Sequence, residues 1–113
     1  MRLQPLDATL GALADPARRG VVELLRKKPR RAGELARALS LSAPNMSRHL
    51  RILRKSGLVE ERGIDDDARV RVYRLRAEPF RALRDWLTEV EAFWEAELAS
   101  FKAHAEKTRK PRR

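Results

Sequence analysis

The chain has 113 residues, 42% of them hydrophobic, so its size fits one domain with a small core. It has no cysteine and no apolar run of membrane-spanning length, which excludes disulfides, thiolate metal sites, thiol redox sensing and a membrane helix. The net charge of +10 lies within residues 18–76, which hold 17 Lys or Arg against 7 Asp or Glu, and this uneven basic surface favours a nucleic-acid partner.

The first part of the chain predicts three short helices. Residues 3–14 carry leucines at helical spacing, which predicts the first. Asp15 followed by Pro16 is typical of a helix start, with the acid as N-cap and proline in the first turn. Pro29 ends this second helix, and a third short helix is expected over residues 32–39.

Residues 43–55 carry the most informative pattern in the chain. Ser42 is expected to cap this helix, and Gly57 is expected to end it in a conformation with positive φ. Apolar residues at i, i+4 and i+7 from Met46 form one stripe, whereas Arg, Asn and Ser side chains occupy the rest of the surface. Such a helix suits the DNA major groove, because its apolar side docks on a domain and its polar side meets phosphates and bases.

The periodicity changes after Gly57. Residues 58–63 and 69–75 alternate apolar and charged side chains, which predicts two antiparallel strands joined through Asp65–Asp67. A helix-turn-helix followed by a hairpin is a winged helix. The expected fold is therefore mainly α, with about five helices and a two-stranded wing over about residues 58–75.

A long helix is expected over residues 79–107, because apolar side chains recur there in a 3-4 pattern. The face is too wide and aromatic for a lone exposed helix, so we expect dimerisation; the alternative is burial within its own domain. The residues of the expected dimer seam are Phe80, Leu83, Leu87, Val90, Trp94 and Phe101. We expect one winged-helix domain over residues 1–107 and a disordered basic tail over 108–113.

Several short motifs together resemble the ArsR/SmtB family of bacterial repressors. The opening Leu13–Arg19 resembles the family's first signature, and Gly33–Ala36 resembles its third helix. The segment Ser47–Leu53 resembles its recognition helix, Ser56–Val59 the exit from that helix, and Arg71–Leu75 the second wing strand. The resemblance extends over about residues 10–101 and keeps the order and spacing of the elements.

The resemblance implies a homodimeric, cytoplasmic repressor that binds a palindromic operator in double-stranded DNA near its own promoter and is released by an inducing signal. The implied base-reading positions are Ser42, Ala43, Asn45, Ser47, Arg48 and His49, and Ala43 is shorter than a polar base reader. The implied phosphate or minor-groove contacts on the wing are Arg62, Arg69 and Arg71, although the acidic Asp65–Asp67 should repel phosphate.

Individual residues in this region keep alternative interpretations. Arg48 suits a phosphate or the acceptors of guanine, or it belongs to a solvated helix face. His49 either donates to DNA or bonds within its own domain. Arg51 and Arg54 lie farther from the end of the helix that enters the groove, so DNA backbone or solvent is expected for them.

Metal and enzyme functions find little support. Family members often carry metal-binding cysteines on the third helix or spaced acids and histidines near the C-terminus, whereas this chain offers only a loose set of Asp85, His104 and Glu106. Ser47 and His49 are two residues apart on a helix and point to different sides, so they are no nucleophile and base pair. We expect no cofactor, no resident metal and no enzyme activity.

Three function classes remain open at this point. The first is a dimeric, sequence-specific regulator released by an unidentified non-thiol, non-metal signal, with an apolar effector among Trp86, Phe93, Trp94 and Phe101 as one hypothesis. The second is an architectural or non-specific nucleic-acid-binding protein. The third is a protein-interaction module that keeps the winged-helix fold.

Overall fold

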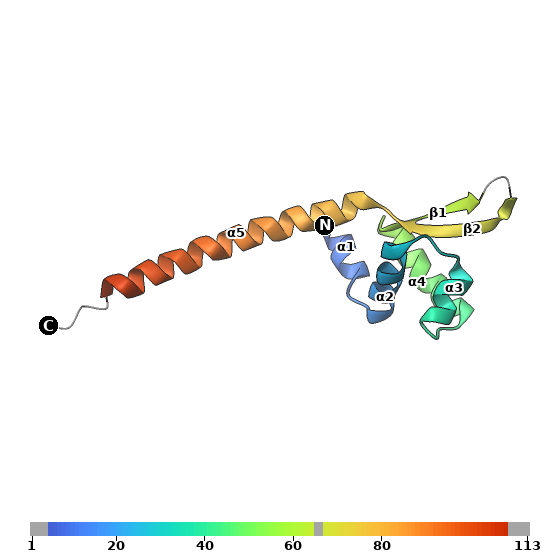
Figure 1. The fold of residues 1–113 in the computed structure, drawn as a ribbon, viewed down its shortest axis with the longest axis horizontal. Coiled ribbons are helices and arrows are strands. Elements are labelled where there is room, and N and C mark those ends of the chain that lie inside the picture. The colour runs from blue at the N-terminus through green and yellow to red at the C-terminus, as the bar shows by residue number, and fades with distance from the viewer. Residues whose placement is uncertain (1–4, 65–66, 109–113) are drawn as a thin grey trace. The chain divides into compact units, whose positions relative to one another are not determined.

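The computed structural model of the chain describes residues 5–64 and 67–108. Four helices are followed by a hairpin and a long helix (Figure 1). In chain order they are α1 (Pro5–Ala12), α2 (Pro16–Lys27), α3 (Ala32–Ala38), α4 (Ala43–Lys55), β1 (Val59–Ile64), β2 (Asp67–Leu75) and α5 (Ala77–Thr108). The predicted architecture, mainly α with a two-stranded wing, is confirmed. The acids Asp65 and Asp66 and the predicted tail beyond Thr108 lie outside the described residues.

The chain packs as two compact units, residues 1–82 and 83–113. The first unit contains α1 to β2 and the beginning of α5. The second contains the remainder of α5. The helix-turn-helix and its wing therefore belong to one compact unit.

Helices α2 and α4 begin at the caps that their sequences predict. The Asp15 carboxylate accepts hydrogen bonds from the backbone N–H groups of Ala17 at 2.8 Å and Arg18 at 3.2 Å. The Ser42 hydroxyl oxygen accepts from the N–H of Asn45 at 3.3 Å. Each cap satisfies backbone donors that lack a partner in the first turn of a helix, which is why the two helices begin where they do.

Gly57 turns the chain from α4 into the wing. Its φ is +83°, a left-handed conformation that glycine adopts without the steric cost of a side chain. The next residue, Leu58, is fully buried, and its N–H donates to the carbonyl of Leu53 at 3.0 Å. The turn thus brings the start of β1 directly against the end of α4.

The core of the first unit gathers apolar side chains from α1 through β1. Its buried members are Ala12, Val21, Leu25, Leu35, Ala36, Met46, Leu50, Leu53, Leu58 and Val59. The stripe predicted for α4 is wholly inside, since Met46, Leu50 and Leu53 are at most 2% exposed. Helix α4 packs on α2, α3 and β1 through this side, so its remaining surface faces outward.

The wing is an antiparallel hairpin in which Val59 pairs with Leu75 and Glu61 pairs with Tyr73. Its register shifts between Gly63 and Ile64. A third short segment joins the sheet, because the Arg30 and Tyr73 backbones exchange hydrogen bonds of 3.1 and 2.8 Å. The connection between α2 and α3 is thereby fastened to the wing.

Helix α5 buries no residue among those described. Along its second-unit portion, Leu87 is 51% exposed, Trp94 56% and Phe101 71%. Phe93 and Trp94 meet edge to face, with ring centroids 5.5 Å apart. Of the predicted seam, Leu87, Trp94 and Phe101 are therefore exposed in the single chain, whereas Phe80, Leu83 and Val90 are half-buried. Phe80 packs against the core of the first unit. No helix in the described part of the chain has the length and apolar character needed to cross a membrane.

Candidate nucleic-acid interface

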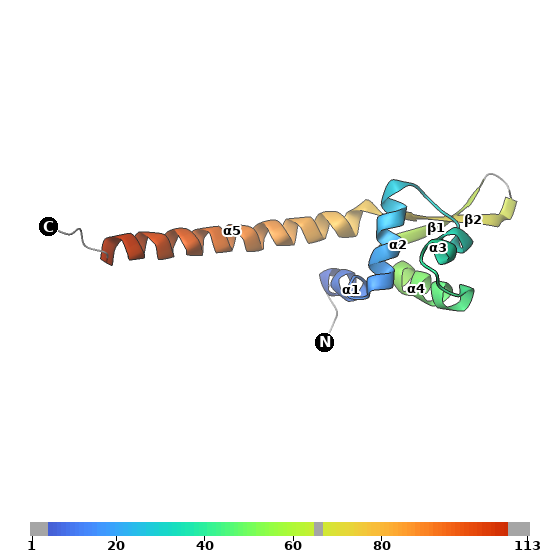
Figure 2. The ribbon, with the colours of Figure 1, turned by 60° about the horizontal axis from the view of Figure 1, so that its bottom comes forward.

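The geometry of the helix-turn-helix presents α4 at the surface of the first unit. Figures 1 and 2 show α2, α3 and α4 gathered at the base of the hairpin, with the wing extending past α3. Because the apolar side of α4 packs against the core, its polar side is the side available to a ligand.

Most of the sequence-predicted DNA-reading residues are exposed at the start of α4 or along it. The exposed members are Ser42, Ala43, Asn45, Ser47, Arg48 and Arg51, whereas His49 is half-buried. Arg48 Nη1 donates to Asn45 Oδ1 at 3.3 Å, so these two predicted base readers contact each other across one helical turn. The hydroxyl of Ser42 is occupied as the helix cap.

His49 contacts a residue from another helix. Its Nδ1 lies 3.4 Å from Nη1 of Arg18, in the first turn of α2. The sequence left open whether His49 meets DNA or bonds within its own domain. In the structure, its Nδ1 makes a contact within the domain. Sequence reasoning did not single out Arg18, whose only signal was its place in the motif Leu13–Arg19.

One face of the wing is organised around Glu61, whose side chain is 17% exposed. Its carboxylate accepts from the Tyr73 hydroxyl at 3.0 Å and pairs with Arg71 at 3.1 Å and Arg54 of α4 at 3.4 Å. Desolvation raises the pKa of this carboxyl, but the hydrogen bonds from Tyr73 and Arg71 and the nearby positive charges outweigh it and lower the pKa. Glu61 thus ties the end of α4 to both wing strands.

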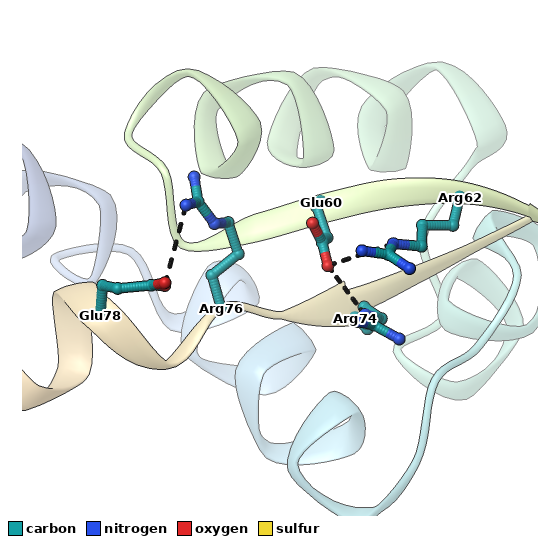
Figure 3. Close-up of polar contacts among 5 residues, drawn as sticks. All are labelled: Glu60, Arg62, Arg74, Arg76 and Glu78. Carbon is teal, nitrogen blue, oxygen red and sulfur yellow. Dashed lines mark hydrogen bonds and ion pairs between the residues drawn. The ribbon is translucent and has the colours of Figure 1, made fainter.

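The other face of the wing carries a second carboxylate with two arginines (Figure 3). Glu60 accepts from Arg74 at 2.8 Å and pairs with Arg62 at 3.4 Å, and the three side chains converge between the strands. The hydrogen bond from Arg74 lowers the pKa of the Glu60 carboxyl, and it outweighs the desolvation of the group. A separate contact of 3.7 Å joins Arg76 to Glu78 at the start of α5.

These ion pairs show which carboxylates the sequence-predicted wing arginines contact. Arg62 and Arg71 each contact a neighbouring carboxylate of β1, and Arg69 lies in β2 with an exposed side chain. The sequence showed both the arginines and the glutamates, but only the strand register determines which of them meet.

A third group of basic residues lies between α3 and the wing. An open hollow of about 580 Å³ is lined by Lys28, Pro29, Arg31, Gly33, Glu34, Arg37, Ile64 and Val72. Of its basic residues, Lys28 and Arg31 lie in the segment between α2 and α3, and Arg37 lies in α3. Glu34 accepts from the N–H of Arg31 at 2.8 Å, and this bond lowers the pKa of its carboxyl. The lining of the hollow therefore combines three basic side chains with apolar residues of the wing.

Among the residues that the structure describes, no group of three or more His, Cys, Asp or Glu side chains is placed to hold a metal ion. The loose set of Asp85, His104 and Glu106 accordingly forms no such group. The aromatic residues that the effector hypothesis invokes are exposed on α5, from Trp86 at 39% to Phe101 at 71%.

Comparison with known proteins gives a consistent result. Residues 15–61 match the family described as bacterial regulatory protein, arsR family. The chain is 39% identical over 95 residues to the HTH-type transcriptional regulator Rv2034 of Mycobacterium tuberculosis, covering 84% of this chain and 83% of that protein. It is 34% identical over 50 residues to the transcriptional repressor SdpR of Bacillus subtilis, a match that spans 44% of this chain and 56% of the relative.

Solved structures agree with this result. An ArsR family transcriptional regulator superposes with a TM-score of 0.72 at 34% identity, covering 81% of this chain and 98% of that one. An ArsR-like transcriptional regulator from Rhodococcus sp. RHA1 gives a TM-score of 0.77 at 27% identity, covering 93% and 94% of the two chains. The likeness thus includes α5 as well as the winged-helix core.

Proposed function

Because the chain belongs to the arsR family of bacterial regulatory proteins, whose members regulate transcription by binding DNA, we propose that it is a dimeric, sequence-specific repressor of its own operon. Its partner would be a palindromic operator in double-stranded DNA. The observation that carries the proposal is α4, a capped helix whose apolar stripe is buried and whose polar side is exposed. That division matches a helix that docks on its domain and enters the major groove.

The base-reading set is proposed to centre on Asn45 and Arg48, which already contact each other, with Ser47 and the half-buried His49 beside them. Arg51 is proposed to meet the DNA backbone, since it lies farther along the helix. On the wing, Arg62, Arg69 and Arg71 are proposed phosphate contacts. The glutamates beside Arg62 and Arg71 hold these side chains in place before DNA arrives.

The proposal is tested by fluorescence anisotropy with DNA from upstream of the protein's own gene and a shuffled duplex, over a salt series. A specific regulator should prefer the upstream duplex by about a thousandfold or more. The logarithm of its affinity should fall against the logarithm of salt with a slope of about −5 or steeper if about six phosphates are neutralised. Equal binding to the two duplexes would favour an architectural protein, and no binding at low salt would favour an interaction module.

Arg48→Ala separates base reading from general attraction. Loss of a good bidentate base contact weakens the upstream duplex by about tenfold or more but weakens shuffled DNA less, because shuffled DNA is held through its phosphates. Lys102→Ala, an exposed basic residue of α5, is the control and should change neither affinity strongly. Equal losses on the two duplexes for Arg48→Ala would contradict a base-reading role.

We propose that a second copy of the chain covers the exposed part of the α5 seam, which carries Leu87, Trp94 and Phe101. An aromatic face of this kind is costly to leave in water, and a symmetric dimer covers the same face on both copies. Trp94 is 56% exposed at its centre, so Trp94→Glu should shift the protein to the monomer in light scattering. Glu95→Gln, at the next position, should leave the dimer intact. A monomeric wild-type protein at micromolar concentration would contradict the proposal.

The releasing signal is proposed to be a small molecule other than a thiol oxidant or a metal, because the chain offers no thiolate. An apolar effector between copies of α5 would contact the aromatic residues around Trp94. A thermal-shift screen tests this, and a bound apolar compound should raise the melting temperature and weaken DNA binding. Absence of stabilisation by every apolar compound in the screen would argue against such an effector.

A further inference from the structure

Arg18 joins three helices through a single guanidinium group. Its Nε donates to the carbonyl of Ala12 at 2.7 Å and its Nη2 to the carbonyl of Gly11 at 3.3 Å, at the end of α1. Its Nη1 lies 3.4 Å from Nδ1 of His49 in α4. The backbone of Arg18 is itself held, since its N–H donates to the capping carboxylate of Asp15. Hydrogen bonds therefore hold Arg18 at its backbone and at two of its guanidinium nitrogens, and the third nitrogen contacts His49.

The chemistry of the two groups determines which way the contact runs. A guanidinium carries only donors and stays charged throughout the ordinary pH range. The nitrogen that faces it must therefore offer a lone pair, so Nδ1 of His49 accepts. A neutral imidazole with a lone pair on Nδ1 carries its proton on Nε2. The 3.4 Å separation is longer than a typical bond of about 3.0 Å, but the other two bonds of Arg18 leave Nη1 aimed at the ring.

We propose that Arg18 is a positioning residue that fixes the tautomer of His49, so that the recognition helix offers DNA one N–H donor at Nε2. The part of this inference that concerns DNA rests on the proposed function, since the Nε2–H donor would meet an acceptor on DNA, either a base edge or a phosphate oxygen. Nε2 lies on the far side of the ring from Nδ1, and the ring is only half-buried. The contact with α2 thus occupies one nitrogen of His49 and leaves the other for a ligand.

The same geometry places Arg18 between the end of α1 and the recognition helix α4. Its two other bonds end on the last residues of α1, so any shift of α1 against α2 moves the group that orients His49. Arg19 offers a matched comparison. It donates to the carbonyl of Leu13 at 2.8 Å, which fastens the same turn, and the structure gives it no bond to His49 among the residues described.

The first test uses long-range nitrogen–proton NMR of the histidine rings in the full-length protein, at about pH 8, where ordinary imidazoles are neutral. His104→Gln assigns the signals of the other histidine. In the wild type, His49 should show a single tautomer with the proton on Nε2. Arg18→Met keeps much of the apolar stem but removes the donor, so His49 should change to a mixture of tautomers. Arg19→Met should leave the wild-type pattern unchanged.

An Nδ1–H tautomer in the wild type, or a pattern that Arg18→Met leaves unaltered, would overturn the inference. Both results are obtained without DNA, so they stand whether or not the protein is a sequence-specific regulator. Thermal unfolding of the two Met variants checks that each is folded during the measurement. A loss of stability shared by both variants reports only the fastening of the turn after α1.

The second test is a double-mutant cycle on DNA, using the upstream duplex and the shuffled duplex. Arg18→Met and His49→Ala should each reduce the preference for the upstream duplex by about tenfold, and together they should do no more than either alone, because they remove one coupled contact. An Nε2 donor to phosphate would instead lower both affinities equally. Losses that multiply in the double variant would overturn the coupling. A wild-type protein with no preference would contradict the proposed function and leave the NMR result intact.

Discussion

Truncation of Leu53 to alanine is expected to destabilise the winged-helix unit by about 3–5 kcal/mol. The side chain is completely buried on the side of α4 that faces the core. The change removes three carbons, and at about 0.8 kcal/mol for each buried methylene this accounts for about 2.4 kcal/mol. The cavity that remains raises the cost further, as in other leucine-to-alanine changes. Because a whole domain is stable by only about 5–15 kcal/mol, the melting temperature should fall by about 12 °C or more.

Ile52 provides a control on the same helix, one residue away. It is 36% exposed, so Ile52→Ala also removes three carbons but should cost less than about 1 kcal/mol. Urea unfolding followed by circular dichroism, at one fixed protein concentration, compares the two variants. Because both substitutions shorten a side chain of α4 by the same number of carbons, the difference between them measures burial. Similar losses in the two variants would refute the orientation of α4 on its core.

The remaining predictions concern a turn, a cap and an ion-pair cluster. Gly57→Ala should destabilise the protein by about 1 kcal/mol, because a φ of +83° is unfavourable for a residue with a side chain, although the space around it is open. Gly11→Ala, at an open helical position, should be neutral or stabilising. Equal shifts in the melting temperatures of the two variants would contradict this prediction. Asp15→Ala should lower the melting temperature more than Asp15→Asn, because only asparagine keeps an oxygen that caps α2, and identical melting curves would count against the cap. The lowered pKa of Glu61 means that its contribution to stability is present above the ordinary value of 4.5 and is lost as the pH falls through the lowered pKa in the folded state. Glu61→Gln should therefore make the unfolding free energy less dependent on pH in the acid range, and an unchanged dependence would show that the ion pairs around Glu61 contribute nothing.

The helices were predictable because their signals are local. Helix α4 spans Ala43–Lys55, as predicted, since a cap at Ser42 and a glycine at 57 lie within one turn of its ends. Helix α5 begins at Ala77, two residues before the predicted start. The earlier start places Pro79 at the third helical position, where its missing N–H removes no helical hydrogen bond, so the proline did not mark the first residue of the helix.

The buried face of α1 was less predictable than its helical conformation. Its leucines recur at helical spacing, yet the residues that it buries are Thr9 and Ala12, and Leu10 is 41% exposed. The hydroxyl of Thr9 donates to the carbonyl of Pro5 at 3.1 Å, which satisfies its donor inside the core. The pattern of large apolar residues identifies an apolar side of a helix, but it does not say which molecule that side meets.

The wing illustrates what depends on register. The sequence predicted two strands and identified their arginines, but it did not give the pairing of Glu60 with Arg74 and of Glu61 with Tyr73, which brings each glutamate to its partners on β2. Successive residues of a strand point to opposite faces, so each glutamate meets a different set of arginines. The contact between Arg18 and His49 is a stronger case, because 31 positions separate the two residues and no periodicity relates them.

A count of basic residues therefore overstates how many of them are available to phosphate. Arg18, Arg19 and Arg30 donate to backbone carbonyls, which fasten the segments before α2 and α3. Arg54 at the end of α4 and three arginines of the wing, Arg62, Arg71 and Arg74, face the carboxylates of Glu60 and Glu61. The carboxylates partly neutralise the charge of these arginines, so each arginine attracts a phosphate less strongly than an isolated cation would. The polar side of α4 differs, since Arg48 and Arg51 are exposed there without a carboxylate partner among the described residues. We therefore expect the excess charge of residues 18–76 to attract DNA, and we propose that the side chains that distinguish one DNA sequence from another are those of α4.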